Sequence, residues 1–142
     1  MLFGKRERRI KRIMIVEDEP LVAFDNESML QDGGYQVVAT VDNYLDAATI
    51  IAREPLDLIL SDITLAGEGS GLDVARAASA LAIPVLFVTG NCTGEAKALA
   101  IGCLAKPYSA RVLLGTLDAV DQHLQGRAPK RVPEELTLYV QA

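Results

Sequence analysis

Five side chains with reactive or charged groups come directly after short apolar runs: Glu17, Asp18, Asp62, Thr89 and Lys106. If these runs are parallel strands, their carboxyl ends meet at one edge of a sheet, and we expect the five side chains to lie together there. Carboxylates, a hydroxyl and an ammonium in one place can hold a divalent cation and a phosphoryl group. The spacing therefore predicts phosphoryl chemistry at a metal ion.

The three carboxylates are the reason to expect the metal ion. Carboxylates about 4 Å apart repel each other by about 4 kcal/mol per pair at an effective dielectric constant of ~20. A bound cation removes that cost. Oxygen ligands with no histidine or thiolate nearby favour Mg²⁺, with Mn²⁺ as a substitute, over zinc.

Asp62 is the candidate nucleophile of this set. A carboxylate beside a bound Mg²⁺ can attack phosphorus, because the ion neutralises charge that repels the incoming group. The Thr89 hydroxyl and the Lys106 ammonium can both contact phosphoryl oxygens. A general base is not needed, since an ionised aspartate has no proton to lose.

Strand-length apolar runs recur five times, with helix-length segments between them. This alternation predicts an α/β fold in which a βα unit is repeated five times. The runs are continuous rather than alternating, as expected for a doubly wound parallel sheet of five strands covered on both faces. The runs are residues 13–16, 37–41, 58–60, 85–88 and 103–105.

Several residues predict where the helices begin and end. Pro20 suits a first helical position, Ser70 with Asp73 forms a capping-box pattern, and Ser109 can cap the last helix. Gly126 suits the end of that helix. Its predicted apolar stripe consists of Leu113, Leu117, Val120 and Leu124.

Length and charge indicate one domain, residues 12–126, between a basic N-terminal arm (1–11) and a C-terminal tail (127–142). The chain has 142 residues, half of them hydrophobic, and a net charge of −5. Because residues 5–12 hold six of the fourteen basic residues, the body is strongly acidic, which argues against a nucleic-acid partner. We interpret the arm as a solubilising leader, and the alternative is that it contacts RNA, DNA or anionic lipid.

The tail is too short for an effector domain, so we expect the domain to act through another protein. The tail contains two prolines and then alternates apolar Leu136, Leu138 and Val140 with polar residues. It is interpreted as a loose tail. The alternative is a short strand that pairs with a partner's sheet edge.

The two cysteines, Cys92 and Cys103, are too few and too far apart for a disulfide scaffold or a CxxC site. We expect free thiols in the cytoplasm. No apolar stretch reaches membrane-spanning length and no secretory signal pattern is present, so no membrane partner is expected.

The ordered motifs IVEDEP, LDLILSD, PVLFVTG and AKPYS resemble the receiver domain of two-component response regulators, over residues 12–125. The resemblance implies a flavodoxin-like sheet with strand order 2-1-3-4-5. It also implies phosphorylation by a sensor histidine kinase or a phosphotransfer protein. For the site, it implies Asp62 as phosphoacceptor, Glu17 and Asp18 as metal-site carboxylates, the Thr64 backbone carbonyl as a further metal ligand, Thr89 as switch hydroxyl, and Lys106 before a cis peptide bond to Pro107.

The chain also departs from the receiver pattern. Most receivers have Tyr or Phe three residues before the lysine, where this chain has Cys103. The loop after Asp62 carries Ala66 where proline is common and is one residue longer before Gly71. PVLFVTG is similar to the motif of the FAT GUY subgroup, which lacks the aromatic switch and is associated with HWE-class kinases in alphaproteobacteria.

The leading hypothesis is a stand-alone, phosphorylation-dependent regulator that binds a downstream protein differently once Asp62 is modified. It is not an enzyme, although slow self-dephosphorylation is expected. One alternative keeps the fold as an interaction module that ignores phosphorylation, and another makes it a phosphate relay or sink. A haloacid dehalogenase-type phosphatase ranks low, because Thr64 stands where those enzymes usually have a second Asp.

Overall fold

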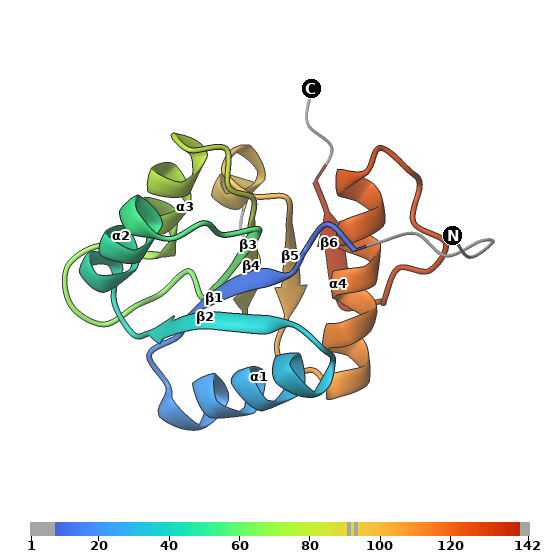
Figure 1. The fold of residues 1–142 in the computed structure, drawn as a ribbon, viewed down its shortest axis with the longest axis horizontal. Coiled ribbons are helices and arrows are strands. Elements are labelled where there is room, and N and C mark those ends of the chain that lie inside the picture. The colour runs from blue at the N-terminus through green and yellow to red at the C-terminus, as the bar shows by residue number, and fades with distance from the viewer. Residues whose placement is uncertain (1–7, 91, 93, 140–142) are drawn as a thin grey trace.

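One sheet with helices on both faces forms the body of the computed structural model, which describes residues 8–90, 92 and 94–139 (Figure 1). The strands are β1 (Arg12–Val16), β2 (Gln36–Val41), β3 (Leu58–Ser61), β4 (Val85–Thr89), β5 (Gly102–Ala105) and β6 (Leu136–Leu138). The helices are α1 (Pro20–Asp32), α2 (Tyr44–Arg53), α3 (Gly71–Ser79), the 3₁₀ helix η1 (Gly94–Ala98) and α4 (Ala110–Leu124).

The strand order is β2-β1-β3-β4-β5-β6, and β1 to β5 are all parallel. The predicted α/β fold and the order 2-1-3-4-5 are therefore confirmed. Val16 lies opposite Ser61, and Thr89 lies opposite Ala105. Because these are the last or nearly last strand residues, the residues that follow them are brought to the same edge, as predicted.

Each face of the sheet has its own hydrophobic cluster, which explains why the strand sequences are continuously apolar. Alternate strand residues point to opposite faces. One cluster packs Met14, Ile59 and Phe87 against α2 and α3. The other packs Ile15 and Leu60, with further strand residues, against α1 and α4. Figure 1 shows these two helix pairs on opposite sides of the sheet.

The predicted helix starts are confirmed. Pro20 is the first residue of α1, and the Ser70 and Asp73 side chains form the capping box of α3. The Ser109 side chain accepts a hydrogen bond from the Val112 N–H at the start of α4. Gly126, just past α4, has a φ of 77°, a left-handed conformation that favours glycine.

The prediction of five full βα units is wrong in the connection between β4 and β5. Among the described residues of that connection, the only helix is η1, a 3₁₀ helix of five residues. Gly90, Gly94 and Gly102 divide this connection into short pieces. Glycine disfavours helix, and a helix of one or two turns has little stability of its own. The helix-prone residues between the glycines are too few to overcome this.

The tail is not loose in the part that the structure describes. β6 pairs antiparallel with β5, with Leu136 opposite Leu104 and Leu138 opposite Gly102. Tyr139 follows β6, is buried, and its N–H donates to the Ile101 carbonyl at 2.9 Å. The alternating pattern predicted a strand but not its partner, which is this chain's own fifth strand. Val140 and the last two residues lie outside the described residues.

The described end of the basic arm packs on the domain. The Arg8 guanidinium lies 4.4 Å from the centre of the Tyr35 ring, and the backbone N–H groups of Arg9 and Ile10 donate to the buried Asp121 carboxylate. Residues 1–7, which include Lys5 and Arg6, lie outside the described residues. In the part of the chain that is described, every helix is too short or too polar to cross a membrane.

Candidate functional site

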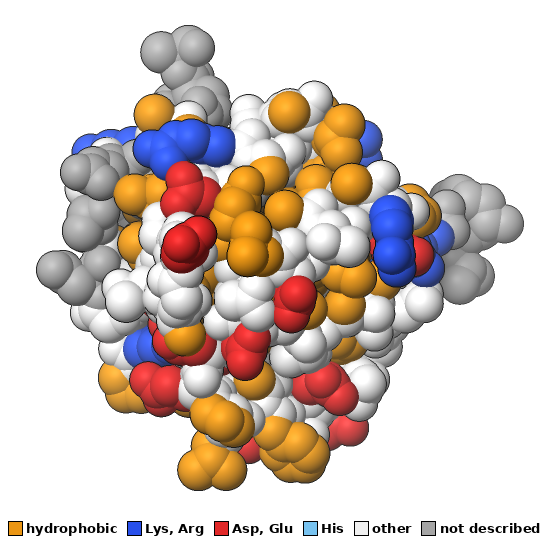
Figure 2. Space-filling view, turned by 90° about the vertical axis from the view of Figure 1, so that its left-hand side faces the viewer, with side chains coloured by type: hydrophobic (Ala, Val, Ile, Leu, Met, Phe, Trp, Pro, Cys, Tyr) orange, Lys and Arg blue, Asp and Glu red, His pale blue; other side chains and the backbone are white. Residues whose placement is uncertain are grey.

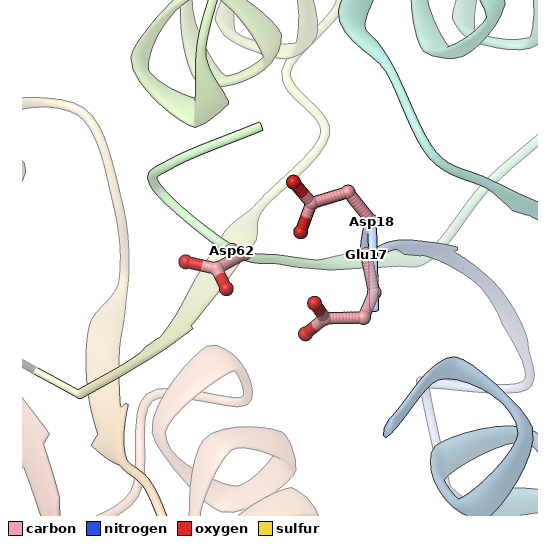
Figure 3. A group of neighbouring side chains, drawn as sticks. All are labelled: Glu17, Asp18 and Asp62. Carbon is pink, nitrogen blue, oxygen red and sulfur yellow. The ribbon is translucent and has the colours of Figure 1, made fainter. Parts of the chain in front are cut away.

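Three carboxylates come together at the carboxyl ends of β1 and β3. Glu17 and Asp18 follow β1, Asp62 follows β3, and one carboxylate oxygen from each lies within 4.8 Å of the other two. Figure 3 shows the three side chains directed toward a common space. Glu17 is 2% exposed and Asp62 is 9% exposed, so water screens their repulsion poorly.

Lys106 joins two of these carboxylates. Its ammonium nitrogen donates to Glu17 Oε1 and to Asp62 Oδ2, each at 2.8 Å. The other carboxylate oxygens receive backbone N–H groups, from Glu19 to Glu17 at 3.1 Å and from Thr64 to Asp62 at 3.2 Å. The side chains from β1, β3 and β5 are thus held together as one network.

The network shifts the ionisation of its members. Burial raises the pKa of Glu17, although the hydrogen bond from Lys106 works in the opposite direction. Burial lowers the pKa of Lys106, but the hydrogen bonds to Asp62 and Glu17 outweigh it, and the net shift is upward. Lys106 therefore stays protonated. Its single positive charge pairs with Glu17 and Asp62, two of the three carboxylates in the cluster.

The donor set fits a hard divalent cation such as Mg²⁺. All three side chains offer carboxylate oxygens, the ligands that Mg²⁺ prefers. Among the residues that the structure describes, nothing donates a hydrogen bond to the half-buried Asp18 carboxylate, so its oxygens are available to an ion. Thr64 lies two residues after Asp62, and its backbone carbonyl stays a predicted fourth ligand.

Thr89 and the Lys106–Pro107 pair lie at the ends of β4 and β5. Thr89 is buried, and its carbonyl accepts a hydrogen bond from the Lys106 N–H at 2.9 Å. The peptide bond between Lys106 and Pro107 is cis, as the resemblance implied. All predicted site residues are therefore at the same edge of the sheet, with Glu17, Asp18, Asp62 and Lys106 forming one cluster.

Two contacts beside the cluster were not predicted. The Tyr108 hydroxyl donates to Asn26 Oδ1 at 2.8 Å, which connects α1 to the segment after Lys106. Burial raises the pKa of Tyr108 to about 12. Gly71 donates its N–H to the Ile63 carbonyl at 2.7 Å, and a Cβ atom there would collide with the Asp62 carbonyl. The loop after Asp62 thus returns closely onto the site.

The expectation of free thiols is wrong: Cys92 and Cys103 form a disulfide. Cys92 is exposed in the connection after β4, and Cys103 is buried on β5. Only 11 positions separate them, and because β4 and β5 are neighbours, a chain leaving β4 can fold back over β5. Their placement on adjacent elements, rather than a CxxC spacing, is the signal that could have indicated the pair.

Comparison with known proteins agrees with this geometry. The family profile described as response regulator receiver domain matches residues 13–118. The phyllosphere-induced regulator PhyR of Methylorubrum extorquens is 35% identical over 102 residues, covering 68% of this chain and 38% of PhyR. Protein PilH of Pseudomonas aeruginosa is 32% identical over 118 residues, covering 77% of this chain and 96% of PilH.

A solved structure shares the fold. The crystal structure of the signal receiver domain of a modulated diguanylate cyclase from Desulfovibrio desulfuricans superposes with a TM-score of 0.74. It is 28% identical, and the match covers 82% of this chain and 97% of that one. The chain spans most of PilH and of this receiver domain, but less than two fifths of the length of PhyR.

Proposed function

The chain belongs to the response regulator receiver family, and we propose that it accepts a phosphoryl group on Asp62 in a Mg²⁺-dependent reaction. The donor is a phosphohistidine on a sensor histidine kinase or a phosphotransfer protein. The observation that carries this proposal is the cluster of Glu17, Asp18 and Asp62 joined by Lys106 at the carboxyl ends of the strands. That edge is where ligands bind in open α/β sheets.

Glu17, Asp18, Asp62 and the Thr64 backbone carbonyl would hold the ion. When bound, Mg²⁺ supplies positive charge that offsets the repulsion between these carboxylates and an incoming phosphoryl group. An Asp62 carboxylate oxygen attacks phosphorus, and the bond from phosphorus to the donor nitrogen breaks with its electron pair on nitrogen. The product is an acyl phosphate on Asp62.

The chain's own side chains orient the transferred group. The Lys106 ammonium, now 2.8 Å from Asp62 Oδ2, can contact a phosphoryl oxygen without moving far, and its raised pKa keeps it charged. Thr89, at the end of the neighbouring strand, can donate its hydroxyl to another phosphoryl oxygen. Phosphorylation then favours a conformation in which these two residues are drawn toward Asp62.

The surface beside the site suits a protein donor and a protein target. Leu21 and Phe24, in the first turns of α1 and close in sequence to Asp18, are 79% and 66% exposed. Figure 2 shows hydrophobic side chains at the lower edge of its face, the level at which α1 lies in Figure 1. Exposed apolar groups of this size next to a reactive site favour protein docking.

Four finer points stay predictions: the HWE kinase class, the FAT GUY subgroup, the stand-alone form and the cytoplasmic location.

A second candidate function is an interaction module that binds its partner regardless of phosphorylation. Cys103, buried where most receivers have an aromatic switch residue, favours it. Equal partner affinity of the wild type and an Asp62→Ala variant would support this alternative over the phosphorylation-dependent regulator.

The direct test is to incubate the protein with Mg²⁺ and acetyl phosphate and to measure its intact mass. We expect one added phosphate on the wild type and none on Asp62→Asn, which keeps the size of the side chain but lacks the anionic oxygen. Asp118→Asn, at an exposed position of α4, is the matched control and should be phosphorylated normally. Chelation of Mg²⁺ should abolish the modification. An unmodified wild type, or equal labelling of Asp62→Asn, would contradict the proposal.

A further inference from the structure

We infer that the Cys92–Cys103 disulfide is a reversible redox switch that controls how readily Asp62 is phosphorylated. The inference rests on the proposed function, because its effect is measured at Asp62. It extends that function by adding a second input, the thiol–disulfide state of the surroundings, at a place in the chain far from the phosphoacceptor in sequence.

The disulfide joins the segment that follows Thr89 to the strand that precedes Lys106. Cys92 lies three residues after Thr89, and Cys103 lies three residues before Lys106. The bond spans 6.1 Å between the two Cα atoms. Cys103 sits between Phe87 of β4 and Thr137 of β6 in the sheet register. The segment after β4 is therefore covalently attached to the middle of the strand that ends at the site.

That attachment matters because the connection has little regular structure to hold it. Between β4 and β5 the described residues form only η1, in contrast to the longer helices elsewhere in the fold. A cross-link restricts a weakly structured segment more than it restricts a helix that is already fixed by its own hydrogen bonds. Reduction should therefore increase the number of conformations available to the residues after Thr89.

Freedom of this segment affects phosphorylation because Thr89 belongs to the switch. A phosphoryl group on Asp62 favours a state in which Thr89 moves, and the residues that follow must move with it. The disulfide fixes the distance between this segment and β5, so it opposes any movement of Thr89 that would change that distance. The oxidised protein should accordingly be phosphorylated more slowly than the reduced protein.

The two sulfurs differ in access, which defines the chemistry of opening. Cys92 is exposed, whereas Cys103 is 0% exposed. An external thiolate, such as that of glutathione, attacks the Cys92 sulfur, and the Cys92–Cys103 bond breaks with its electrons on Cys103, which takes up a proton. A second external thiolate attacks the mixed disulfide and releases the Cys92 thiol. Two external thiols become one disulfide, and the protein gains two electrons and two protons.

Reversible reduction of the Cys92–Cys103 bond agrees with what is known of disulfides in reducing compartments. Disulfides in reducing compartments are usually transient and redox-sensing, and exposed ones are more easily reduced than buried ones. Here one partner faces solvent while the other lies in the core, so exchange can begin from outside without unfolding the sheet.

The first measurement is the redox state of the folded protein. The protein is equilibrated with mixtures of reduced and oxidised glutathione, quenched with acid, unfolded, alkylated and weighed by mass spectrometry. We expect no alkyl groups on the oxidised protein and two on the reduced protein. A disulfide that reduced glutathione or dithiothreitol opens only after the protein has been unfolded would overturn the inference.

The second measurement is the initial rate of phosphorylation by acetyl phosphate with Mg²⁺, for oxidised and reduced wild type and for Cys92→Ser. This variant removes the exposed cysteine and leaves the buried Cys103 in place, so the core is unchanged. We expect the initial rate of the oxidised wild type to be lower than that of the reduced wild type by a factor of about five or more. A factor of about five is the lower end of typical allosteric couplings. Cys92→Ser should match the reduced wild type and should not respond to glutathione.

Hydrogen exchange supplies a readout independent of activity. On reduction, amide exchange in η1 should accelerate, while exchange in β1 and β3 should stay the same. Equal phosphorylation rates in both redox states would overturn the inference but leave the proposed function standing. No phosphate uptake in either state would overturn both, so the two failures can be distinguished.

Discussion

The carboxyl edge of the sheet has two sides, one formed by β1 and β3 and the other by β4, β5 and β6. The two sides differ in how closely their structure matches what the sequence predicted. On the first side, the carboxylates at the strand ends lie where their spacing predicted, and Lys106 reaches across to them. On the second side, the connection is a 3₁₀ helix, a disulfide crosses it, and a sixth strand covers β5. The carboxylate cluster has the arrangement that the receiver resemblance implied, whereas the 3₁₀ connection, the disulfide and the added strand β6 were not implied by it.

The difference has a physical origin. Groups at the ends of adjacent parallel strands are placed by the sheet register, which depends on a few short apolar runs. The switch region depends on contacts outside the order of the five parallel strands, such as the antiparallel pairing of β5 with β6. None of the β5–β6 register pairs includes a residue of the carboxylate cluster. We therefore expect that the β5–β6 pairing can change while the carboxylates stay in place.

The largest expected effect comes from breaking the acidic side at its only described cation. Lys106→Met leaves the buried carboxylates of Glu17 and Asp62 without their ammonium. We expect the free energy of unfolding to fall by about 3 kcal/mol at neutral pH without Mg²⁺, measured by urea denaturation. The deficit should shrink when Mg²⁺ is added. Lys130→Met, at an exposed position, is the control and should stay within about 0.5 kcal/mol of the wild type. Similar losses in both variants would show that the network does not stabilise the fold.

A smaller effect should follow from loosening the opposite side. Leu136 is a buried residue of β6, and Leu136→Ala removes its contacts with the cluster beneath α4. We expect a loss of about 2 kcal/mol, near the low end for buried leucines because the strand lies at the edge. Phosphate uptake by Asp62 in the reduced protein should remain. Thr137→Ala, exposed on the same strand, should have little effect. A loss of Mg²⁺ binding in Leu136→Ala would contradict the independence of the two sides.

The smallest effect is a pH dependence remote from both sides. Burial raises the pKa of Tyr35 from 10.0 to about 12, despite the nearby Arg8. Because the folded state resists ionisation, the stability from Tyr35 is complete below pH 10 and is lost as the pH rises through about 12. At about pH 11 the wild type should have lost about 1 kcal/mol relative to Tyr35→Phe, as seen by denaturation across the pH range.

The same comparison at neutral pH provides a check on this interpretation. The Tyr35 hydroxyl has no hydrogen-bond partner among the described residues, so Tyr35→Phe should be nearly as stable as the wild type at pH 7. Tyr44→Phe, at a less buried position of α2, serves as the control. An identical alkaline loss in wild type and Tyr35→Phe would show that other groups cause it.

Sequence patterns predicted the features that follow from where each apolar run or helix begins and ends. The strand runs, the Ser70 capping box and the convergence of Asp62 with Glu17 follow from periodicity and from the ends of the runs, and the structure confirms them. The pairing of β6 and the Cys92–Cys103 bond depend on which segments meet after folding. Alternation at residues 136–140 indicates a strand without naming its neighbour. Cysteine spacing likewise does not reveal which strands become adjacent.

The connection between β4 and β5, for which a full helix was predicted, shows a different limit. The residues between Gly90 and Gly102 include alanines that favour helix, and their number is compatible with one. The glycines lower that tendency by about 1 kcal/mol each, and no hydrophobic stripe is long enough to compensate. The difference between the helix propensity of the alanines and the cost of the glycines is too small for a sequence pattern to predict whether a full helix forms.

The sixth strand also determines which surfaces of the sheet another chain can extend. A bare strand edge is a template for intermolecular β-pairing. Because β6 is present, the outer edge of β5 is already paired. Within the described chain, the long strand with an open edge is β2, at the opposite margin of the sheet. A second molecule that extends the sheet at this margin would therefore have to pair with β6, which has only three residues, rather than with β5.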